Sequence, residues 1–281
     1  MRAPFGARIT TAVSLRGPLC VGIDPHTSLL EQWGLPVDAN GLASFAMTCV
    51  EAFAGEIAVV KPQSAFFEAH GSAGVAVLER MITAFRQAGT LVLLDVKRGD
   101  IGSTAQAYAD AFIPLADAVT VNPYLGRDSL ELFVEACRRE GAGMFCLVKT
   151  SNPGSADLQD VRLANGRLLW QHVADIVREL GESLVGECGL SSVGAVVGAT
   201  FPAEVVEARQ LLPQSPLLLP GIGAQGGAPA EVAGAFSAGP ASALLSASRS
   251  VIYASSGPDW RDAAAADAER LAREAWRVSR A

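Results

Sequence analysis

Short apolar runs with polar ends recur along this 281-residue chain, and stretches with helical periodicity separate them. Eight of these runs have the length and character of buried strands: 19–24, 57–61, 91–97, 118–122, 144–149, 193–197, 217–220 and 243–246. An amphipathic pattern over 259–278 predicts a closing helix. Eight strand–helix units in this length are typical of an α/β TIM (β/α)8 barrel. We therefore expect residues 1–281 to form a single barrel domain with a terminal helix.

A doubly wound sheet is the alternative fold, but it usually has fewer units and places its site at a switch point in strand order. Polar residues distinguish the two folds, because they fall at or just after the ends of the expected strands. They are Asp24, Lys61, Asp95, Lys97, Asn122, Lys149 and Ser151. Barrel enzymes build their sites at the carboxyl ends of their strands. The pattern therefore favours a barrel enzyme.

Composition excludes several classes of partner. The chain is 50% hydrophobic, and its formal net charge of −7 argues against nucleic acid as a main partner. An anionic small substrate stays compatible with this charge, because a local cluster of cations and N–H groups outweighs a diffuse negative surface. The five cysteines are odd in number and widely spaced, which predicts reduced thiols in a cytoplasmic protein. Apolar runs are short and broken, so we expect no signal peptide, membrane span or membrane partner.

The most informative polar cluster is Leu91-Val-Leu-Leu-Asp95-Val-Lys97-Arg-Gly-Asp100. Strand side chains alternate with period two, so Asp95 and Lys97 should point to the same side. An acid and an ammonium at the mouth of an apolar core are costly unless they pair or take part in chemistry. Gly99 permits a turn that brings Asp100 nearby. The simpler interpretation is an ion pair at a strand end.

A glycine-rich segment, Gly221-Ile-Gly223-Ala-Gln-Gly226, matches the G-x-G-x-x-G dinucleotide pattern. No acidic residue ends the next strand to hold a ribose, so the dinucleotide interpretation is weak. That strand instead runs into Ser246-Ala-Ser-Arg249. A glycine-rich turn after strand seven and an arginine after strand eight are how barrels bind one phosphate group. The alternative is a flexible loop beside a surface arginine.

These residues together resemble the orotidine 5'-phosphate decarboxylase family, in particular its longer bacterial subgroup. The matching elements are Asp24 in Gly-Ile-Asp-Pro, Lys61 in Val-Val-Lys-Pro, Asp95-x-Lys97-x-x-Asp100-Ile101 followed by Thr104, Ser151 before Asn-Pro-Gly, Pro220-Gly-Ile-Gly-Ala-Gln225-Gly-Gly, and Arg249 in Ser-Arg-Ser-Val-Ile-Tyr. The chain departs from many members at Gly102, where they carry proline, and its stretch after Ser151 is longer than in compact members.

The resemblance implies decarboxylation of orotidine 5'-monophosphate to UMP in de novo pyrimidine biosynthesis, with no metal and no cofactor. It implies catalytic roles for Lys97, Asp95, Asp100 and Lys61. It implies substrate-binding roles for Asp24, Lys61, Ile101, Thr104, Ser151, Pro220, Gln225 and Arg249.

Individual roles also follow from the resemblance. Lys97 would stabilise charge at C6 of the pyrimidine and then protonate it, and Asp95 would lie next to the departing carboxylate. Lys61 and Asp24 would meet the ribose hydroxyls, Ser151 the base, and Gln225 and Arg249 the phosphate. The resemblance assigns Asp100, Ile101 and Thr104 to the site of the neighbouring subunit. It therefore implies a homodimer with shared active sites.

Two other functions remain open on the same barrel. One is a Mg²⁺-dependent sugar-phosphate aldolase or decarboxylase, although such relatives usually carry an acid in place of Lys61. The other is a catalytically inactive barrel that binds UMP, although a binding module has little reason to keep Lys97 between two acids. Simple structural roles are expected for three further residues: Asn122 as a turn cap, Lys149 as a strand-end charge and His26 as a loop histidine.

Overall fold

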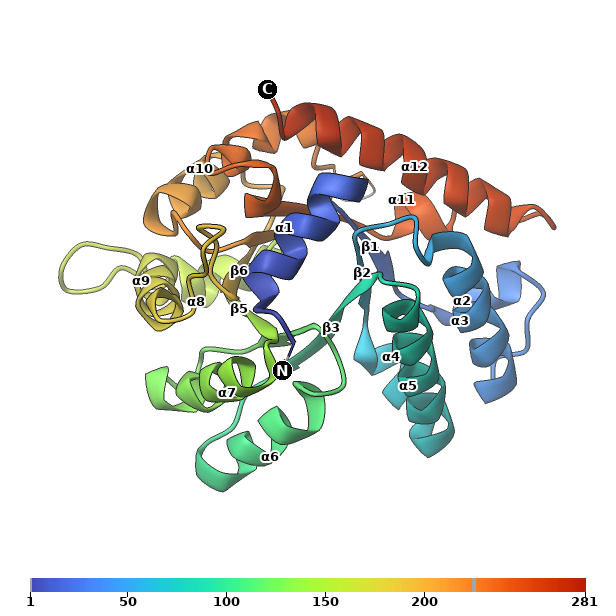
Figure 1. Cartoon of the computed structure of the whole chain (residues 1–281), viewed down its shortest axis with the longest axis horizontal. Coiled ribbons are helices and arrows are strands. Elements are labelled where there is room, and N and C mark those ends of the chain that lie inside the picture. The colour runs from blue at the N-terminus through green and yellow to red at the C-terminus, as the bar shows by residue number, and fades with distance from the viewer. Residues whose placement is uncertain (1, 224–225) are drawn as a thin grey trace.

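The computed structural model describes residues 2–223 and 226–281, and its eight strands close into a parallel barrel in chain order (Figure 1). The strands are β1 (Leu19–Ile23), β2 (Val59–Pro62), β3 (Leu91–Arg98), β4 (Ala118–Val121), β5 (Gly143–Lys149), β6 (Val193–Val197), β7 (Leu217–Pro220) and β8 (Ala243–Ala247). The predicted TIM barrel is confirmed, and every expected strand lies within two residues of an observed one.

Long helices surround the barrel (Figure 1). They are α3 (Ala39–Phe53), α5 (Gly71–Gln87), α6 (Gly102–Phe112), α7 (Arg127–Glu140), α9 (Leu169–Glu182), α10 (Pro202–Leu211) and α12 (Trp260–Val278). Each buries one apolar face, as α5 does with Leu78, Met81, Ile82 and Phe85. None of the described helices is long and apolar enough to cross a bilayer.

Shorter elements fill the loops between strands and outer helices. They are α2 (Thr27–Gln32), α4 (Ser64–Glu68), α8 (Ala156–Gln159), α11 (Arg249–Ile252), and the 3-10 turns η1 (Pro153–Ser155), η2 (Pro229–Phe236) and η3 (Pro240–Ser242). Most of them follow the carboxyl end of a strand. They therefore shape the rim at which a barrel builds its site.

Helix α1 (Phe5–Arg16) closes the amino-terminal end of the barrel and crosses its middle in Figure 1. Phe5 and Ile9 are fully buried, and the Phe5 ring meets the Phe145 ring edge-on with centroids 5.9 Å apart. The apolar positions of this helix are separated by arginines and threonines, so its sequence gives little sign of a buried face. The sequence pattern did not predict it.

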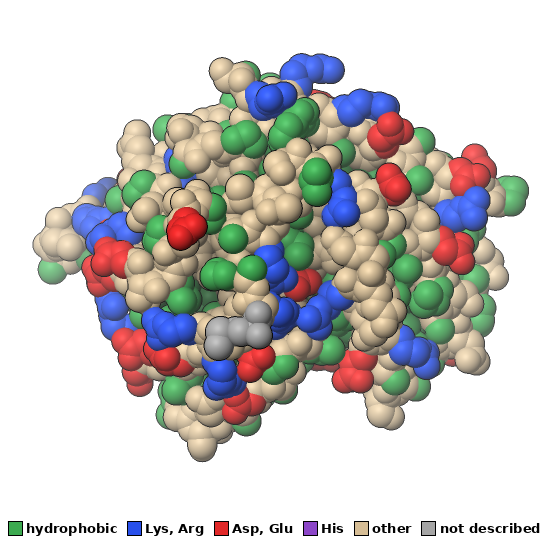
Figure 2. All heavy atoms as spheres, viewed as in Figure 1, with side chains coloured by type: hydrophobic (Ala, Val, Ile, Leu, Met, Phe, Trp, Pro, Cys, Tyr) green, Lys and Arg blue, Asp and Glu red, His purple; other side chains and the backbone are tan. Residues whose placement is uncertain are grey.

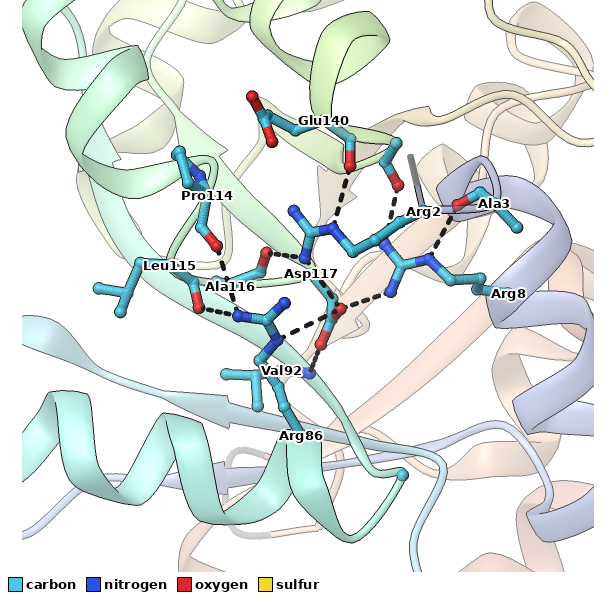
Figure 3. Close-up of polar contacts among 12 residues, drawn as sticks. Arg2, Ala3, Arg8, Arg86, Val92, Pro114, Leu115, Ala116, Asp117 and Glu140 are labelled. Carbon is cyan, nitrogen blue, oxygen red and sulfur yellow. Dashed lines mark hydrogen bonds and ion pairs between the residues drawn. The ribbon is translucent and has the colours of Figure 1, made fainter.

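A buried carboxylate, Asp117, fastens α1 to the barrel (Figure 3). Arg8 forms an ion pair with it, and nitrogen atoms of Arg2 and Arg86 lie 3.5 and 3.8 Å from its Oδ1 atom. The other oxygen accepts the N–H of Val92 at 2.9 Å. Figure 2 shows Lys and Arg side chains gathered near the middle of this face. The amino-terminal end is therefore packed shut, and the strand ends that carry the candidate residues open on the opposite side.

Candidate active site

A cavity of about 770 Å³ lies at the carboxyl ends of the strands. Five of the predicted site residues line it together: Lys61, Asp95, Lys97, Ser151 and Pro220. They come from β2, β3, the loop after β5, and β7. The barrel thus brings together residues that are far apart in the chain, at the end where the sequence pattern predicts a site.

Asp95 is the centre of the charged cluster. Its Oδ2 atom accepts hydrogen bonds from Lys61 Nζ at 2.8 Å and from Gln63 Nε2 at 3.2 Å. Its Oδ1 atom accepts from Lys97 Nζ at 2.6 Å and from Thr120 Oγ1 at 2.8 Å. Asp95 and Lys97 do lie together at the cavity, as predicted, although the backbone of Lys97 departs from regular strand geometry with a φ of +45°.

The ion pairs outweigh the cost of burying these groups. Burial by itself would raise the pKa of Asp95, but the ammonium groups of Lys61 and Lys97 hold it well below its usual range. Burial would lower the pKa of Lys61, but the carboxylates of Asp95 and Asp24 raise it above its usual value. Asp95 and Lys61 are therefore charged at neutral pH. The Lys97 side chain is 45% exposed, so its ammonium can reach a ligand in the cavity.

Thr120 and Gln63 are two cluster members that the sequence pattern did not reveal. Thr120 lies inside β4, two residues before Asn122 at the strand end. Gln63 directly follows β2. Neither carries charge, so neither is conspicuous in an apolar run. Their positions in the sequence could have revealed them, because both lie near the carboxyl ends of strands, where side chains that point into the barrel come together.

Asp24 lies just after β1 and contacts the segment that follows β8. Ser248 Oγ donates to Asp24 Oδ2 at 2.6 Å. The Oδ1 atom of Asp24 is buried and has no hydrogen-bond partner in the part of the chain that the structure describes. A buried carboxylate oxygen normally accepts a hydrogen bond. This oxygen is therefore available to a hydroxyl group of a ligand.

The loop after β7 meets the segment after β8, as the phosphate-site hypothesis requires. Gly223 has a φ of +77°, and a Cβ atom there would lie 2.9 Å from Ser250 Oγ. Only glycine suits both the backbone conformation and the close approach. Arg249 opens α11 and is exposed. The predicted phosphate ligand Gln225 lies outside the described residues.

Besides Asp24 and Arg249, three more predicted residues do not line this cavity: Asp100, Ile101 and Thr104. The Asp100 carboxylate accepts the N–H of Ile101 at 2.8 Å, and Ile101 is 59% exposed. Thr104 lies exposed in the first turn of α6. Their assignment to a neighbouring subunit's site therefore stays a prediction.

The long segment after Ser151 folds back onto β5. Lys149, which is 2% exposed, places its Nζ atom 2.6 Å from Asp160 Oδ1 and 5.3 Å from the centre of the Phe201 ring. The N–H of Thr150 donates to Gln159 Oε1 at 2.9 Å. Lys149 is thus a buried anchor for this segment, which is more than the strand-end charge that was expected.

Close packing also fixes Ser151 itself. A Cβ atom at Gly198, just after β6, would lie 2.9 Å from the Cβ atom of Ser151.

The structural roles expected for Asn122 and His26 agree with the geometry. Asn122 Oδ1 accepts the N–H of Tyr124 at 3.0 Å, as a turn cap does, and the His26 ring packs against Phe66 with centroids 4.3 Å apart. Among residues 2–223 and 226–281, no three His, Cys, Asp or Glu side chains are grouped to hold a metal ion.

Residues 17–261 match the family described as Orotidine 5'-phosphate decarboxylase / HUMPS. The chain belongs to this family. The resemblance drawn from the sequence is therefore confirmed. The match begins after α1 and ends at the start of α12, so it covers all eight strands but neither the helix that closes the amino-terminal end nor most of the last helix.

Similar proteins carry the name of one branch of the family. A Salinispora tropica protein named orotidine 5'-phosphate decarboxylase is 51% identical over 260 residues, which are 91% of each chain. A Nocardioides protein of the same name is also 51% identical, over 257 residues, covering 89% of this chain and 92% of its own. A crystal structure assigned as this enzyme from Streptomyces avermitilis is 48% identical with a TM-score of 0.90, and the alignment covers 100% of this chain and 97% of that one.

Proposed function

We propose that this chain is a carboxy-lyase that converts orotidine 5'-monophosphate to UMP in de novo pyrimidine biosynthesis. The names of relatives at about half identity support this assignment. The observation that carries it is the alternating Lys61–Asp95–Lys97 array, which lines the cavity with both lysines bonded to one carboxylate. Such an array of fixed charges would stabilise negative charge that builds up on a carbon atom of the substrate.

We infer one orientation of the substrate from the positions of the proposed binding residues. Its phosphate would lie at the Gly223 loop with Arg249, where a guanidinium can bind two phosphate oxygens. The Oδ1 atom of Asp24 would accept a ribose hydroxyl, beside Lys61. Ser151 would contact the pyrimidine, and C6 would then face Lys97. Pro220, at the end of β7, and Gln225 complete the proposed binding set.

The chemical step needs one proton and no electron acceptor. The bond between C6 and the carboxylate carbon breaks, CO₂ leaves, and the bonding electron pair stays on C6. The Lys97 ammonium stabilises this charge and donates a proton to C6, after which the amine regains a proton from water. Asp95 would lie next to the departing carboxylate and hold Lys97 in place.

We also propose that the reaction needs no metal and no cofactor. Both oxygens of Asp95 already face ammonium groups, Lys61 on one side and Lys97 on the other. A divalent cation at this carboxylate would meet two positive charges. The Mg²⁺-dependent sugar-phosphate chemistry left open by the sequence is therefore the less favoured function. A chelator distinguishes the two functions, because only the Mg²⁺-dependent sugar-phosphate activity should be lost.

We propose further that the protein works as a homodimer in the cytoplasm. Asp100, Ile101 and Thr104 lie outside their own cavity, and apolar side chains are exposed beside it, with Ile101 at 59% and Tyr124 at 75%. A partner subunit that covers this rim would bury these groups and bring its own Asp100 to the cavity. The cytoplasmic location rests on the cysteines, since all five are free thiols.

The direct test is to follow the loss of orotidylate absorbance and the formation of UMP with the purified protein. Turnover should persist in EDTA and should be absent from a Lys97→Ala preparation, which controls for contaminating enzyme. If the wild-type protein gave no UMP while remaining folded, the proposed function would be wrong. Activity on a sugar phosphate that required Mg²⁺ would favour the alternative.

A further inference from the structure

Thr120 is hydrogen-bonded to two charged residues of β3, Asp95 and Lys97. It lies inside β4, is 1% exposed, and lines the cavity. We propose that Thr120 is a positioning residue, whose hydroxyl holds the Lys97 backbone and the Asp95 carboxylate in their working geometry. This inference rests on the proposed function, because it assigns Thr120 a part in that reaction.

The hydroxyl of Thr120 makes two hydrogen bonds of opposite sense. It accepts the backbone N–H of Lys97 at 2.9 Å and donates to Asp95 Oδ1 at 2.8 Å. A hydroxyl has one hydrogen to donate, and that hydrogen goes to the carboxylate, because the Lys97 N–H can only be a donor. One oxygen atom therefore links the main chain of Lys97 to the acid that holds its ammonium.

The strand ladder explains why a side chain is needed there. Leu94 pairs with Val119, and the next pair is Arg98 with Val121, so the register of β3 against β4 shifts between them. Three residues of β3 thus face the single residue Thr120. Such an irregularity leaves backbone groups without their usual ladder partner. For Lys97, the Thr120 hydroxyl takes the place of a backbone carbonyl.

The backbone of Lys97 also has an uncommon conformation. Its φ is +45°, and among the described residues it is the one non-glycine residue with a positive φ. Such conformations persist only where surrounding contacts fix them. The conformation sets the direction in which the side chain leaves the strand, and the Nζ atom ends 2.6 Å from Asp95 Oδ1. The hydrogen bond from the Lys97 N–H to Thr120 is therefore in a position to maintain this backbone conformation.

Thr120→Val removes the hydroxyl and keeps the shape of the side chain. We expect kcat for orotidine 5'-monophosphate to fall by about tenfold or more, while KM changes by less than about threefold, because the groups that bind ribose and phosphate are untouched. Thr120→Ser keeps the hydroxyl and should restore kcat to within about threefold of wild type. The split between kcat and KM, and the rescue by serine, separate positioning from a general loss of structure.

Thr90→Val is the matched control. Thr90 is also 1% exposed, and its hydroxyl accepts the N–H of Gly55 at 2.8 Å, on the side of the barrel away from the cavity. Its substitution should lower the thermal midpoint as Thr120→Val does, with kcat unchanged. If Thr120→Val kept wild-type kcat, or if Thr120→Ser lost as much kcat as valine, Thr120 would not position the array. If the valine variant fails to fold, Thr120→Ala provides a second variant without the hydroxyl, and its kcat is compared with that of Thr120→Ser in the same way.

A crystal structure of Thr120→Ser or Thr120→Val separates this inference from the proposed function. If wild-type protein does not decarboxylate orotidylate, the proposed function fails, but the geometry can still be compared. In the valine variant, Lys97 should leave the positive-φ region or its Nζ atom should move away from Asp95 Oδ1. An unchanged Lys97 in that variant would overturn the inference whatever the substrate.

Discussion

The Nζ atom of Lys61 lies 2.8 Å from Oδ2 of Asp95, and both side chains are less than one-tenth exposed. Removing one partner of a buried pair is costly, because it leaves the other charge buried without its compensation. Lys97 still faces Asp95 after Lys61 is removed, which limits the loss of folding stability. The pair therefore contributes to stability as well as to the charge array of the cavity.

The first prediction concerns Lys61→Met and pH. At pH 7 and fixed protein concentration, the substitution should lower the free energy of unfolding by about 3 kcal/mol. The native pKa of Asp95 lies below its unfolded value, so its contribution is present above about pH 4 and is lost as the pH falls further. The native pKa of Lys61 is raised, so its contribution is present below about pH 10 and is lost at higher pH.

Urea unfolding at several pH values checks this prediction. The difference between wild type and Lys61→Met should be constant near neutral pH and should shrink in acid, where the variant can protonate Asp95. Glu269→Gln, on an exposed ion pair with Arg273, is the control and should change stability little at any pH. A difference that grew in acid would contradict a lowered pKa for Asp95.

The second prediction is that Lys97→Ala folds and binds UMP but loses nearly all turnover. Its side chain is 45% exposed, so its removal leaves little buried surface behind. Steady-state assays and UMP titration by calorimetry measure the two effects separately. Turnover within about tenfold of wild type, or ~1.4 kcal/mol in the barrier, would remove Lys97 from the role of proton donor.

Much of the fold and part of the site could be predicted from the sequence. Apolar runs locate strands because their burial is a local property of the chain, and period two predicts Asp95 and Lys97 on one side of the strand. Thr120 could not be predicted in the same way. Its role depends on a register shift between β3 and β4, which arises from the packing of the whole barrel.

Other features depend on contacts between distant parts of the chain. Helix α1 is fixed by the contacts that Arg8 and Phe5 make far along the sequence. The burial of Lys149 depends on Asp160, which lies in a segment without strong periodicity. The proposed role of Asp100 depends on a second subunit. The local pattern of apolar and polar residues does not reveal contacts between residues that are far apart in the sequence or that belong to different subunits.

The third prediction concerns the phosphate end of the cavity. Arg249→Ala should chiefly raise KM for orotidine 5'-monophosphate, because a guanidinium fork is lost while the array at Asp95 stays intact. The same substitution should have little effect on orotidine that lacks its phosphate. Comparison of kcat/KM for the two substrates provides the test. Equal loss on both would mean that Arg249 does not bind phosphate.

The fourth prediction concerns the buried anchor of the long segment. Asp160→Asn leaves the Lys149 ammonium buried without its carboxylate, so the segment that carries Gln159 and follows Ser151 should loosen. We expect KM to rise and limited proteolysis to cut within 152–168 more readily. Glu179→Gln, which breaks an exposed pair with Arg127 outside this segment, is the comparison variant and should leave proteolysis within 152–168 unchanged. Equal protease resistance of Asp160→Asn and wild type would contradict this role for Lys149.

The last prediction tests whether subunits share their sites. If each site needs Lys97 from one chain and Asp100 from the other, Lys97→Ala and Asp100→Ala homodimers should both be nearly inactive. A mixed dimer would contain one site with both lesions and one site with neither. Random exchange of two equally stable variants makes about half the dimers mixed, and half the sites in those dimers are intact. Activity should therefore recover to roughly a quarter of wild type.

The experiment is to unfold and refold the two variants together and to compare the product with each variant refolded alone. Native mass spectrometry of protein with one variant isotopically labelled counts the mixed dimers in the same sample. Recovery is the expected result because Asp100 does not line the cavity of its own chain and the family resemblance assigns it to the site of the neighbouring subunit. Absence of recovery in a sample where half the dimers are mixed would place Asp100 in the site of its own subunit, and the loop after β3 would then have to fold inward when substrate binds.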